Sequence, residues 1–403
     1  MLYGITALLT LTACTADKEA ELFQGFTASE IRSMERITEK TSPPLDASNK
    51  WDGNEDAISF GEELFQNTTL SAEGISCSTC HNPEKGFSDG LKLSEGVGET
   101  SRHAPHLYEQ KTQTWFFWDG RCDSLWCQAI SPIEAPKEMN ASRTEVAFAI
   151  REDSDLKEMY ETIFGSLPDM SSWPRQARPD EDEASAPAMA WSSMSEDEQD
   201  AATEVLVNAV KSIAAFEATI ETPVSEIDSF AMLYRENPEE ALASLTVEQE
   251  QGLRLFVGKG NCHFCHSGSS FTNGEFHNIG LGERDWLLDT DNGRYLGIDA
   301  LEANPFNRQG IWSDSTEDQL ASRIDRLARS TEQLGQFKVP SLRNVRNTAP
   351  YMHGGHFETL EEVVQFYITL GEEPVQGHRE ELVMRQDWSP EEVAALVSFL
   401  EML

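Results

Sequence analysis

The sequence predicts an all-α protein built from two related halves, and three observations support this. The segments "TEVLVNAVKSIAAFEATI" (203–220) and "SPEEVAALVSFLEML" (389–403) carry apolar residues at the i, i+3, i+4 spacing of amphipathic helices. The strict alternation of half-buried strands is scarce. Two stretches of the chain are also repeated, which indicates an internal duplication.

The stricter repeat has no gap. "PHLYEQKTQTWFFWDGRCDSL" from Pro105 matches "PSLRNVRNTAPYMHGGHFETL" from Pro340, at a shift of 235 residues. A looser repeat relates residues 61–90 to residues 252–274. Its matched pairs are Gly61/Gly252, Leu64/Leu255, Phe65/Phe256, Cys77/Cys262, Cys80/Cys265, His81/His266, Phe87/Phe271 and Gly90/Gly274.

The chain begins with a short apolar segment, "MLYGITALLTLTAC", which is too short to span a bilayer but suits a secretory signal. Its end, Leu11 to Cys14, resembles the lipobox of bacterial lipoproteins, in which the cysteine is acylated. We therefore expect a signal peptide over 1–14 and a periplasmic protein anchored to the cell envelope through Cys14. The alternative is a frayed start in which Cys14 is incidental.

Composition divides the remaining chain. Residues 15–50 are polar and contain "TSPPLDASNK", which predicts a flexible tether. An N-terminal domain over 51–240 and a C-terminal domain over 241–403 follow. The acidic, Ser/Pro-rich stretch near 166–200 is expected to form an inserted surface loop.

The net charge is strongly negative. Lys and Arg number 31 against 70 Asp and Glu, a formal charge of −39. Such a surface repels phosphates, so nucleic acid is excluded as a partner, whereas a basic protein would be steered toward it. A solvated surface suited to a salty medium is the other interpretation.

The repeated motif is Cys-x-x-Cys-His, the attachment signature of c-type haem, in which the thiols bind the vinyl groups and the histidine ligates the iron. Paired cysteines also make zinc sites, but zinc gives no reason for a histidine directly after both pairs. We expect two covalently bound haem c groups. Their residues are Cys77, Cys80 and His81 for the first haem, and Cys262, Cys265 and His266 for the second.

From about Ile58 onward the chain resembles the bacterial di-haem cytochrome c peroxidase and MauG family. The matching blocks are "CSTCHNPEKGFSDG", "FFWDGRCDSL", "FVGKGNCHFCH", "FHNIGL" and "FKVPSLRNVRNTAPYMHGGHFETLEEVVQFY". The resemblance implies two cytochrome c-like domains. It also implies a peroxide-binding haem in the first domain and an electron-relaying haem in the second.

The sixth ligand decides what each haem can do. Thr359 and Glu362 form a capping box, and Tyr367 lies on the apolar face of the helix that follows. The resemblance implies that Tyr367 ligates the second iron, because MauG-type members have tyrosine where peroxidase members have methionine. Met352 and His353 remain alternative ligands, and a core tyrosine is the plain alternative.

The first haem is expected to lack a sixth protein ligand. The position equivalent to Tyr367 is Pro132, which has no side-chain donor atom, and no histidine lies between His81 and His103. We therefore expect this iron to be five-coordinate or water-bound.

Three residues of the first half match the catalytic positions of the family. Glu138 would shuttle a proton, Gln128 would orient peroxide, and Trp118 would relay electrons between the haems. Without the resemblance, the first two would be interpreted as solvated side chains and the third as a core aromatic.

The family's calcium site is only partly present. The resemblance places carbonyl ligands at Thr348 and Pro350, but His103 stands where the family has asparagine. Because imidazole is a poor ligand for a hard cation, the sequence predicts a weakened calcium site.

Cys122 and Cys127 remain after haem and lipid take the other five cysteines. Inside one helix they would be separated by about 7.5 Å of rise, too far for a disulfide. If Ser124 caps the helix, Cys122 lies outside it and a disulfide can form. A pair of free thiols is the alternative.

These observations predict a haem-dependent peroxidase that reduces hydrogen peroxide with electrons from a cytochrome c or copper protein. One alternative is a MauG-like enzyme that oxidises side chains of a partner protein. Another is a non-catalytic di-haem electron carrier. A homodimer is a candidate assembly.

Overall fold

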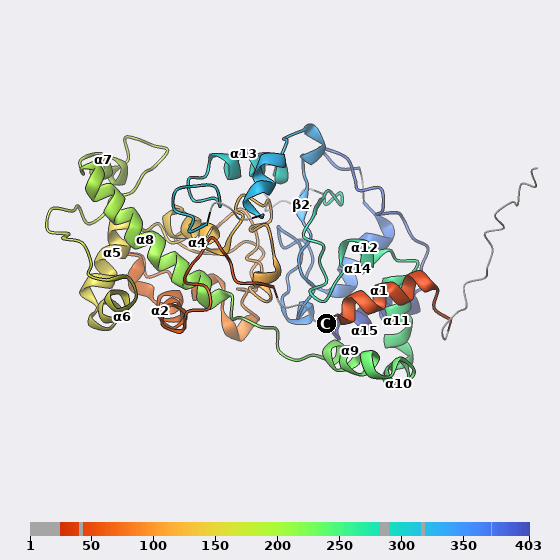
Figure 1. The fold of residues 1–403 in the computed structure, drawn as a ribbon. Helices are drawn as coiled ribbons and strands as arrows, with labels where there is room; N and C mark the ends of the chain where they lie inside the picture. The colour runs from red at the N-terminus through yellow and green to blue at the C-terminus, as the bar shows by residue number, and fades with distance from the viewer. Residues whose placement is uncertain (1–24, 40–42, 283–289, 316–318, 372) are drawn as a thin grey trace, which may run out of the picture.

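The computed structural model describes residues 25–39, 43–282, 290–315, 319–371 and 373–403 (Figure 1). The described part is mainly helical, which confirms the all-α prediction. Its α-helices are α1 (Ala28–Thr38), α2 (Glu55–Gln66), α3 (Cys77–Cys80), α4 (Leu125–Glu134), α5 (Arg143–Glu152), α6 (Ser154–Phe164), α7 (Ala186–Ser192), α8 (Glu196–Glu217), α9 (Glu226–Glu236), α10 (Pro238–Ser244), α11 (Val247–Val257), α12 (Cys262–Cys265), α13 (Arg294–Ala303), α14 (Leu360–Thr369) and α15 (Pro390–Leu400). The 3-10 helices are η1 (Thr68–Leu70), η2 (Pro83–Lys85), η3 (Gln110–Thr112), η4 (Ala321–Arg326), η5 (Thr331–Gln333) and η6 (Val345–Asn347).

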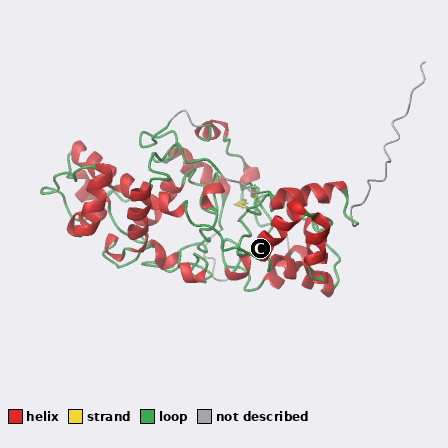
Figure 2. Cartoon of the chain, turned by 60° about the horizontal axis from the view of Figure 1, so that its bottom comes forward, coloured by secondary structure: helices red, strands yellow, loops and turns green. Residues whose placement is uncertain are grey.

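One two-stranded antiparallel sheet is described, in which β1 (Phe276–His277) pairs with β2 (Phe337–Lys338). Phe276 lies opposite Lys338 and His277 opposite Phe337. Figure 2 shows that loops, with this small sheet among them, occupy the middle of the molecule between two groups of helices.

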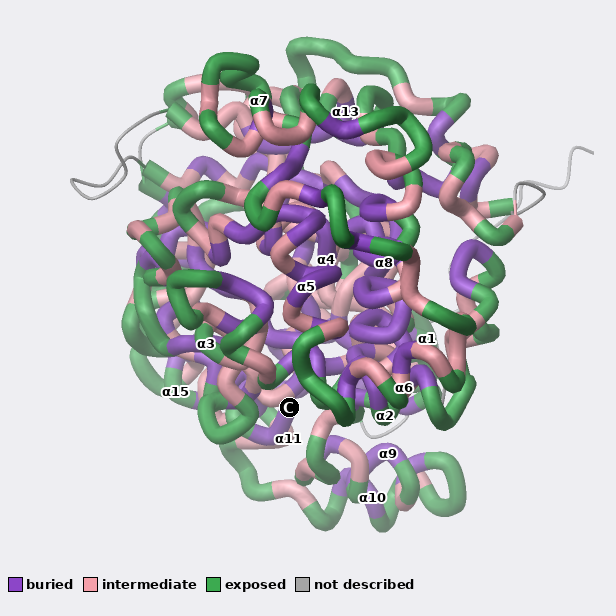
Figure 3. The backbone as a smooth tube through the Cα atoms, turned by 90° about the vertical axis from the view of Figure 1, so that its left-hand side faces the viewer, coloured by how far each residue is buried: buried purple, intermediate pink, exposed green. Residues whose placement is uncertain are grey.

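Two hydrophobic cores lie at the two ends. The first is built around α2, α4, α5 and α8, and the second around α1, α9, α11, α14 and α15. Buried backbone lies in the interior and exposed backbone around it (Figure 3). Because α9 and α10 pack into the second core, the cores divide after α8 rather than at 240. Phe306 and Trp312 pack into the first core, across the expected boundary.

In each core a glycine allows two helices to pack closely. A Cβ on Gly61 of α2 would lie 2.0 Å from the carbonyl oxygen of Ser212 in α8, and one on Gly252 of α11 would lie 2.1 Å from that of Ala395 in α15. Any side chain there would force the helices apart. The repeated glycines therefore mark equivalent helix crossings.

The 235-residue repeat is reproduced in the backbone. The helices α4 and α14 begin and end at equivalent residues, and Ser124 and Thr359 cap them through hydrogen bonds to backbone N–H groups. Before each helix an antiparallel bridge forms, between Phe116 and Cys122 in the first half and between its equivalents in the second. The duplication therefore extends to local geometry.

The prediction of a flexible tether over 15–50 is wrong where the structure describes that segment. Helix α1 begins with a capping box between Thr27 and Glu30 and buries Met34 and Ile37 in the second core. In Figure 1 this red helix lies beside α11 and α15, far from α2. Three apolar residues are enough for α1 to pack in this core. The polar composition of the segment therefore did not indicate an amphipathic helix.

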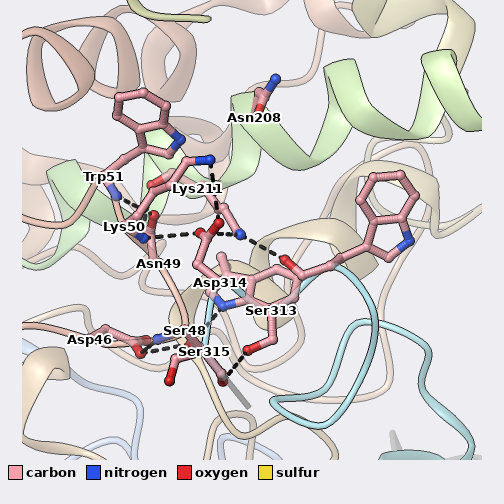
Figure 4. A network of polar contacts seen from close by, with 12 residues as sticks. Asp46, Ser48, Asn49, Lys50, Trp51, Asn208, Lys211, Ser313, Asp314 and Ser315 are labelled. Atoms are coloured by element: carbon pink, nitrogen blue, oxygen red, sulfur yellow. Dashed lines mark hydrogen bonds and ion pairs between the residues drawn. The ribbon is translucent and has the colours of Figure 1, made fainter. Parts of the chain in front are cut away.

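Residues 46–50 dock on the first domain instead. Asn49 donates to the carbonyl of Lys211 in α8 (2.8 Å), and the indole N–H of Trp126 donates to Ser48 (2.9 Å). The ammonium of Lys211 pairs with Asp314 (2.5 Å), as Figure 4 shows. These polar contacts fix a segment whose composition predicted mobility.

The acidic stretch near 166–200 is also more ordered than predicted. It contains α7 and the start of α8, and it buries Met170 and Trp173. Arg178 is buried and donates to the carbonyl of Ala141 (2.8 Å). The many charged residues of this stretch are exposed, but a few of its side chains, such as Met170, Trp173 and Arg178, are buried and fix it to the domain.

Candidate functional site

Both Cys-x-x-Cys segments form one-turn helices, α3 and α12, and the histidine follows directly. The backbone N–H of His81 donates to Cys77 (2.9 Å), and that of His266 donates to Cys262 (2.8 Å). The Nδ1 atoms lie near the carbonyl oxygens of Phe87 (3.2 Å) and Phe271 (3.0 Å). Donation from Nδ1 to a carbonyl leaves Nε2 free to ligate a metal.

Burial keeps both imidazoles neutral, as a metal ligand must be. It lowers the pKa of His81 and lowers that of His266 to about 4. Among the described cysteines, the four of the two motifs are free thiols, and burial raises their pKa values. Cysteines that are not bridged to one another are available for thioether formation.

A single cavity of about 570 Å³ is lined by both motifs, so it reaches into both halves. At its first end it is lined by His81, Gln128, Pro132 and Glu138. Gln128 and Pro132 lie one turn apart on α4, and Glu138 follows the helix. The structure therefore brings together the residues that the sequence predicted for the first site, and Pro132 offers no ligating atom there.

Glu138 is half-buried, and burial raises the pKa of its carboxyl while nearby Arg121 lowers it. The guanidinium of Arg121 is paired with Asp119 (3.0 Å) and lies 3.4 Å from the ring centre of Phe117. Arg121 is thus held by other groups. A carboxyl of raised pKa in a cavity is suited to accept and return a proton.

The second end of the cavity is lined by His266 and Tyr367. On α14, Leu360 and Val364 are buried as expected, whereas Tyr367 is half-buried because it lines the cavity. Burial, and then the thiols of Cys265 and Cys262, raise the pKa of its phenol. Tyr367 and the second motif therefore line the same cavity.

The alternative ligands Met352 and His353 also line the cavity, but the ring of His353 is engaged elsewhere. It stacks on Phe337 with ring centres 3.6 Å apart, and it lies edge-on to Trp118 at 6.3 Å. Burial lowers its pKa well below the ordinary value. His353 therefore lies at the junction between the two halves, a position that the sequence analysis did not anticipate for this alternative ligand.

The two halves meet through reciprocal hydrogen bonds. The backbone N–H of His103 donates to His353 (2.7 Å), and that of Lys338 donates to Trp118 (2.8 Å). At the 235-residue shift, Lys338 is the equivalent of His103, and His353 is the equivalent of Trp118. An approximate two-fold axis therefore relates the two hydrogen bonds. Trp118 thus lies beside its own equivalent, and the 235-residue shift was the signal that could have identified His353.

Polar contacts of two further side chains complete this junction. The indole N–H of Trp118 donates to the carbonyl of His103 (2.9 Å), which fixes the ring. Arg102 pairs with Asp119 (2.6 Å) of its own half and with Asp291 (2.7 Å) of the other. The junction between the halves is therefore held by buried polar contacts as well as by stacked rings.

Three buried polar atoms of residues that line the cavity have no hydrogen-bond partner among the described residues: Oε2 of Glu217, Nε2 of His277 and Nε1 of Trp388. Lys338 also lines it; its ammonium donates to Trp115 (3.0 Å), and burial lowers its pKa to about 8. An apolar cavity with unsatisfied ring nitrogens at His277 and Trp388 fits haem, whose macrocycle is apolar and whose carboxylates need donors.

The residues at the expected calcium position do not fit that cation. One nitrogen of His103 lies 2.7 Å from the carbonyl oxygen of Leu91, and the other lies 3.4 Å from the hydroxyl of Ser88. Thr348 is buried, and Pro350 lines the haem cavity. No group of three or more His, Cys, Asp or Glu suited to a metal is found in the described residues.

Cys122 and Cys127 form a disulfide, with Cα atoms 5.7 Å apart. Ser124 caps α4 by accepting from the N–H of Cys127 (3.2 Å), so Cys122 lies outside the helix. The disulfide closes the turn that precedes Gln128.

Comparison with known proteins identifies the family. Residues 55–236 match the model of the di-haem cytochrome c peroxidase family. The chain is 30% identical to the methylamine utilization protein MauG of Paracoccus denitrificans, over 78% of this chain and 74% of that protein. It is 26% identical to the cytochrome c551 peroxidase of Nitrosomonas europaea, over 87% of this chain and 80% of that protein.

Solved structures agree. A MauG-like protein associated with microbial copper homeostasis has a TM-score of 0.61 at 25% identity, covering 90% of this chain and 93% of its own. The di-haem peroxidase BthA from Burkholderia thailandensis shares the fold, with a TM-score of 0.63 at 20% identity over 87% of this chain and 86% of its own. Within the described ranges, no helix combines the length and apolarity needed to cross a membrane. The chain belongs to the di-haem cytochrome c peroxidase and MauG family, which makes it a haem-dependent oxidoreductase of the peroxidase type.

Proposed function

We propose that this protein carries two covalently bound haem c groups and reduces hydrogen peroxide at the first, drawing electrons through the second from a protein donor. The first haem would be held by Cys77, Cys80 and His81, and the second by Cys262, Cys265 and His266. The observation that carries this proposal is the contrast between the two ends of the cavity. One end presents Pro132 and Glu138, and the other presents Tyr367.

Bound haem supplies an iron that can coordinate peroxide where the protein provides no sixth ligand. Glu138 accepts a proton from one peroxide oxygen and returns it to the other, so that water can leave. Gln128, on the same face of α4 as Pro132, orients the peroxide by hydrogen bonding. Burial of Glu138 supports this role, because its raised pKa lets the carboxyl hold the proton between the two transfers.

Trp118 is placed to relay electrons. Its ring is fixed by the hydrogen bond to His103 and lies beside His353 at the junction of the halves. Two adjacent π systems shorten each electron step across the junction. The chain belongs to a family whose named relatives are enzymes, which argues against the alternative of a non-catalytic electron carrier.

A second candidate function is favoured by Tyr367. A phenolate ligand stabilises higher oxidation states of iron more than a thioether does, which suits MauG-like oxidation of side chains in a partner protein. The acidic surface would attract a basic partner in either case. We further propose a periplasmic protein, lipid-anchored through Cys14, which lies outside the described residues. A homodimer is the assembly proposed with it.

The test uses protein matured in a bacterial periplasm. We expect two haems per chain that resist acid–acetone extraction, no structural zinc, and peroxide-dependent oxidation of a reduced small cytochrome c or copper protein. Zinc without iron would overturn the cofactor proposal. Haem-loaded protein that reacts with peroxide but oxidises only a protein partner would replace the favoured function with the MauG-like one.

A further inference from the structure

Glu217 is a buried acid at the proposed first haem site that takes no part in the proposed peroxide reduction. It is the last residue of α8, and the residue is 4% exposed. It lines the cavity, and its carboxylate charge acts on the thiol of Cys77 in the first motif. Its Oε2 atom is buried without a hydrogen-bond partner in the described part of the chain.

The surroundings disfavour a charged carboxylate. Burial raises the pKa of Glu217 to about 8, and the carbonyl end of α8 carries partial negative charge that acts in the same direction. The ionisable groups on the surrounding elements include Glu62 and Glu63 of α2, Glu134 of α4, Arg143 of α5, Cys77 of α3, and Glu109, Lys111 and Glu221 of the adjoining loops. His81, His106, Asp119, Arg121 and Glu138 line the same cavity.

None of the charged neighbours neutralises it. Arg143 pairs with Glu134 (2.9 Å), and Lys111 pairs with Glu221 (3.6 Å). Glu62 and Glu63 are exposed to solvent. The charge of Glu217 acts on the Cys77 thiol, and this thiol becomes an uncharged thioether once haem is attached. The charge most able to affect Glu217 is therefore that of the haem itself.

We propose that Glu217 is a redox-linked proton site of the first haem, which takes up one proton from solvent when that haem gains an electron and releases it when the electron leaves. The proposal rests on haem attachment at Cys77 and Cys80, as proposed above. Each one-electron reduction removes one positive charge from the cavity, so the protonated carboxyl is favoured. Charge in this poorly solvated cavity then stays constant through the electron step.

The sign of the effect follows from linkage. The pKa of Glu217 is lower with the oxidised haem than with the reduced haem, because positive charge favours the carboxylate. Between these two pKa values, the reduction equilibrium falls tenfold per pH unit, about 59 mV for one electron. Below both values and above both values, Glu217 contributes no pH dependence.

The experiment is a spectroelectrochemical titration of the haem-loaded protein across a range of pH. We expect Glu217→Gln to abolish the tenfold-per-unit dependence and hold the potential near its low-pH value, because glutamine stays neutral. Glu204→Gln, at an exposed position of the same helix, is the matched control and should keep the dependence. Unchanged pH dependence in Glu217→Gln would refute the proposal.

Redox-difference infrared spectroscopy tests the unaltered protein, so a variant that fails to fold does not end the test. Reduction should produce the C=O band of a protonated carboxylic acid, and Glu217→Gln should remove it. No such band on reduction would also refute the proposal. Absence of haem absorbance would instead refute the cofactor proposal, so the two failures are distinct.

Discussion

Replacing Glu138 with glutamine tests the proposed proton transfer at the first haem. The change keeps the size of the side chain and its hydrogen-bonding capacity, but the amide cannot accept and return a proton. The other acids that line the cavity are poor substitutes. Asp119 is held by Arg102 and Arg121, and Glu217 has a separate role in our proposal.

The expected loss is therefore the whole contribution of general acid–base catalysis. Such a contribution is about 10²–10⁴ in rate, which corresponds to about 2.7–5.4 kcal/mol of activation free energy. We expect peroxide turnover to fall by a factor in this range while the haem spectrum stays nearly unchanged. The exposed Glu95→Gln is the control and should keep parental turnover.

The pH profile gives a second measurement. Burial raises the pKa of Glu138, so its carboxyl is protonated at pH values where an exposed glutamate is ionised. Because the carboxylate must first accept a proton, parental turnover should fall as pH decreases through this raised pKa. This acidic decline should be missing in Glu138→Gln. Turnover within about twofold of the parent would remove Glu138 from the mechanism.

Four further outcomes are expected. Tyr367→Met should raise the reduction potential of the second haem, and Tyr367→Phe should open its iron to added ligands. Redox titrations followed by absorbance measure both effects. Unchanged ligation in both variants would make Tyr367 a core residue. Replacing Cys122 and Cys127 together with alanine should lower the free energy of unfolding by about 2 kcal/mol, the value for a six-residue loop, and no change in denaturant midpoint would contradict this. Gly252→Ala should cost about 1–3 kcal/mol by forcing a Cβ against the carbonyl of Ala395, with an unchanged melting temperature as the contrary result. Chelation with EDTA should leave haem spectra and turnover intact, whereas a loss restored by added calcium would show that the cation binds.

Much of the fold and the site could be predicted from local sequence. The two haem motifs are contiguous, because thiols and imidazole must reach one macrocycle from a single turn. The ungapped repeat placed Pro132 opposite Tyr367 in equivalent helices, and both line the cavity. The role of Ser124 as a helix cap could likewise be predicted from the sequence, because capping depends on neighbouring residues.

What only the tertiary structure decided depends on contacts between distant segments. Helix α1 is polar in composition, yet it packs in the second core because three apolar residues lie on one face. His353 contacts Trp118, and Glu217 lies buried beside the first haem motif, although neither is near those groups in sequence. A sequence records which residues have helical spacing or a repeated partner. Burial and desolvation arise only when separate segments come together, so they determined which acids hold protons and which rings form the junction.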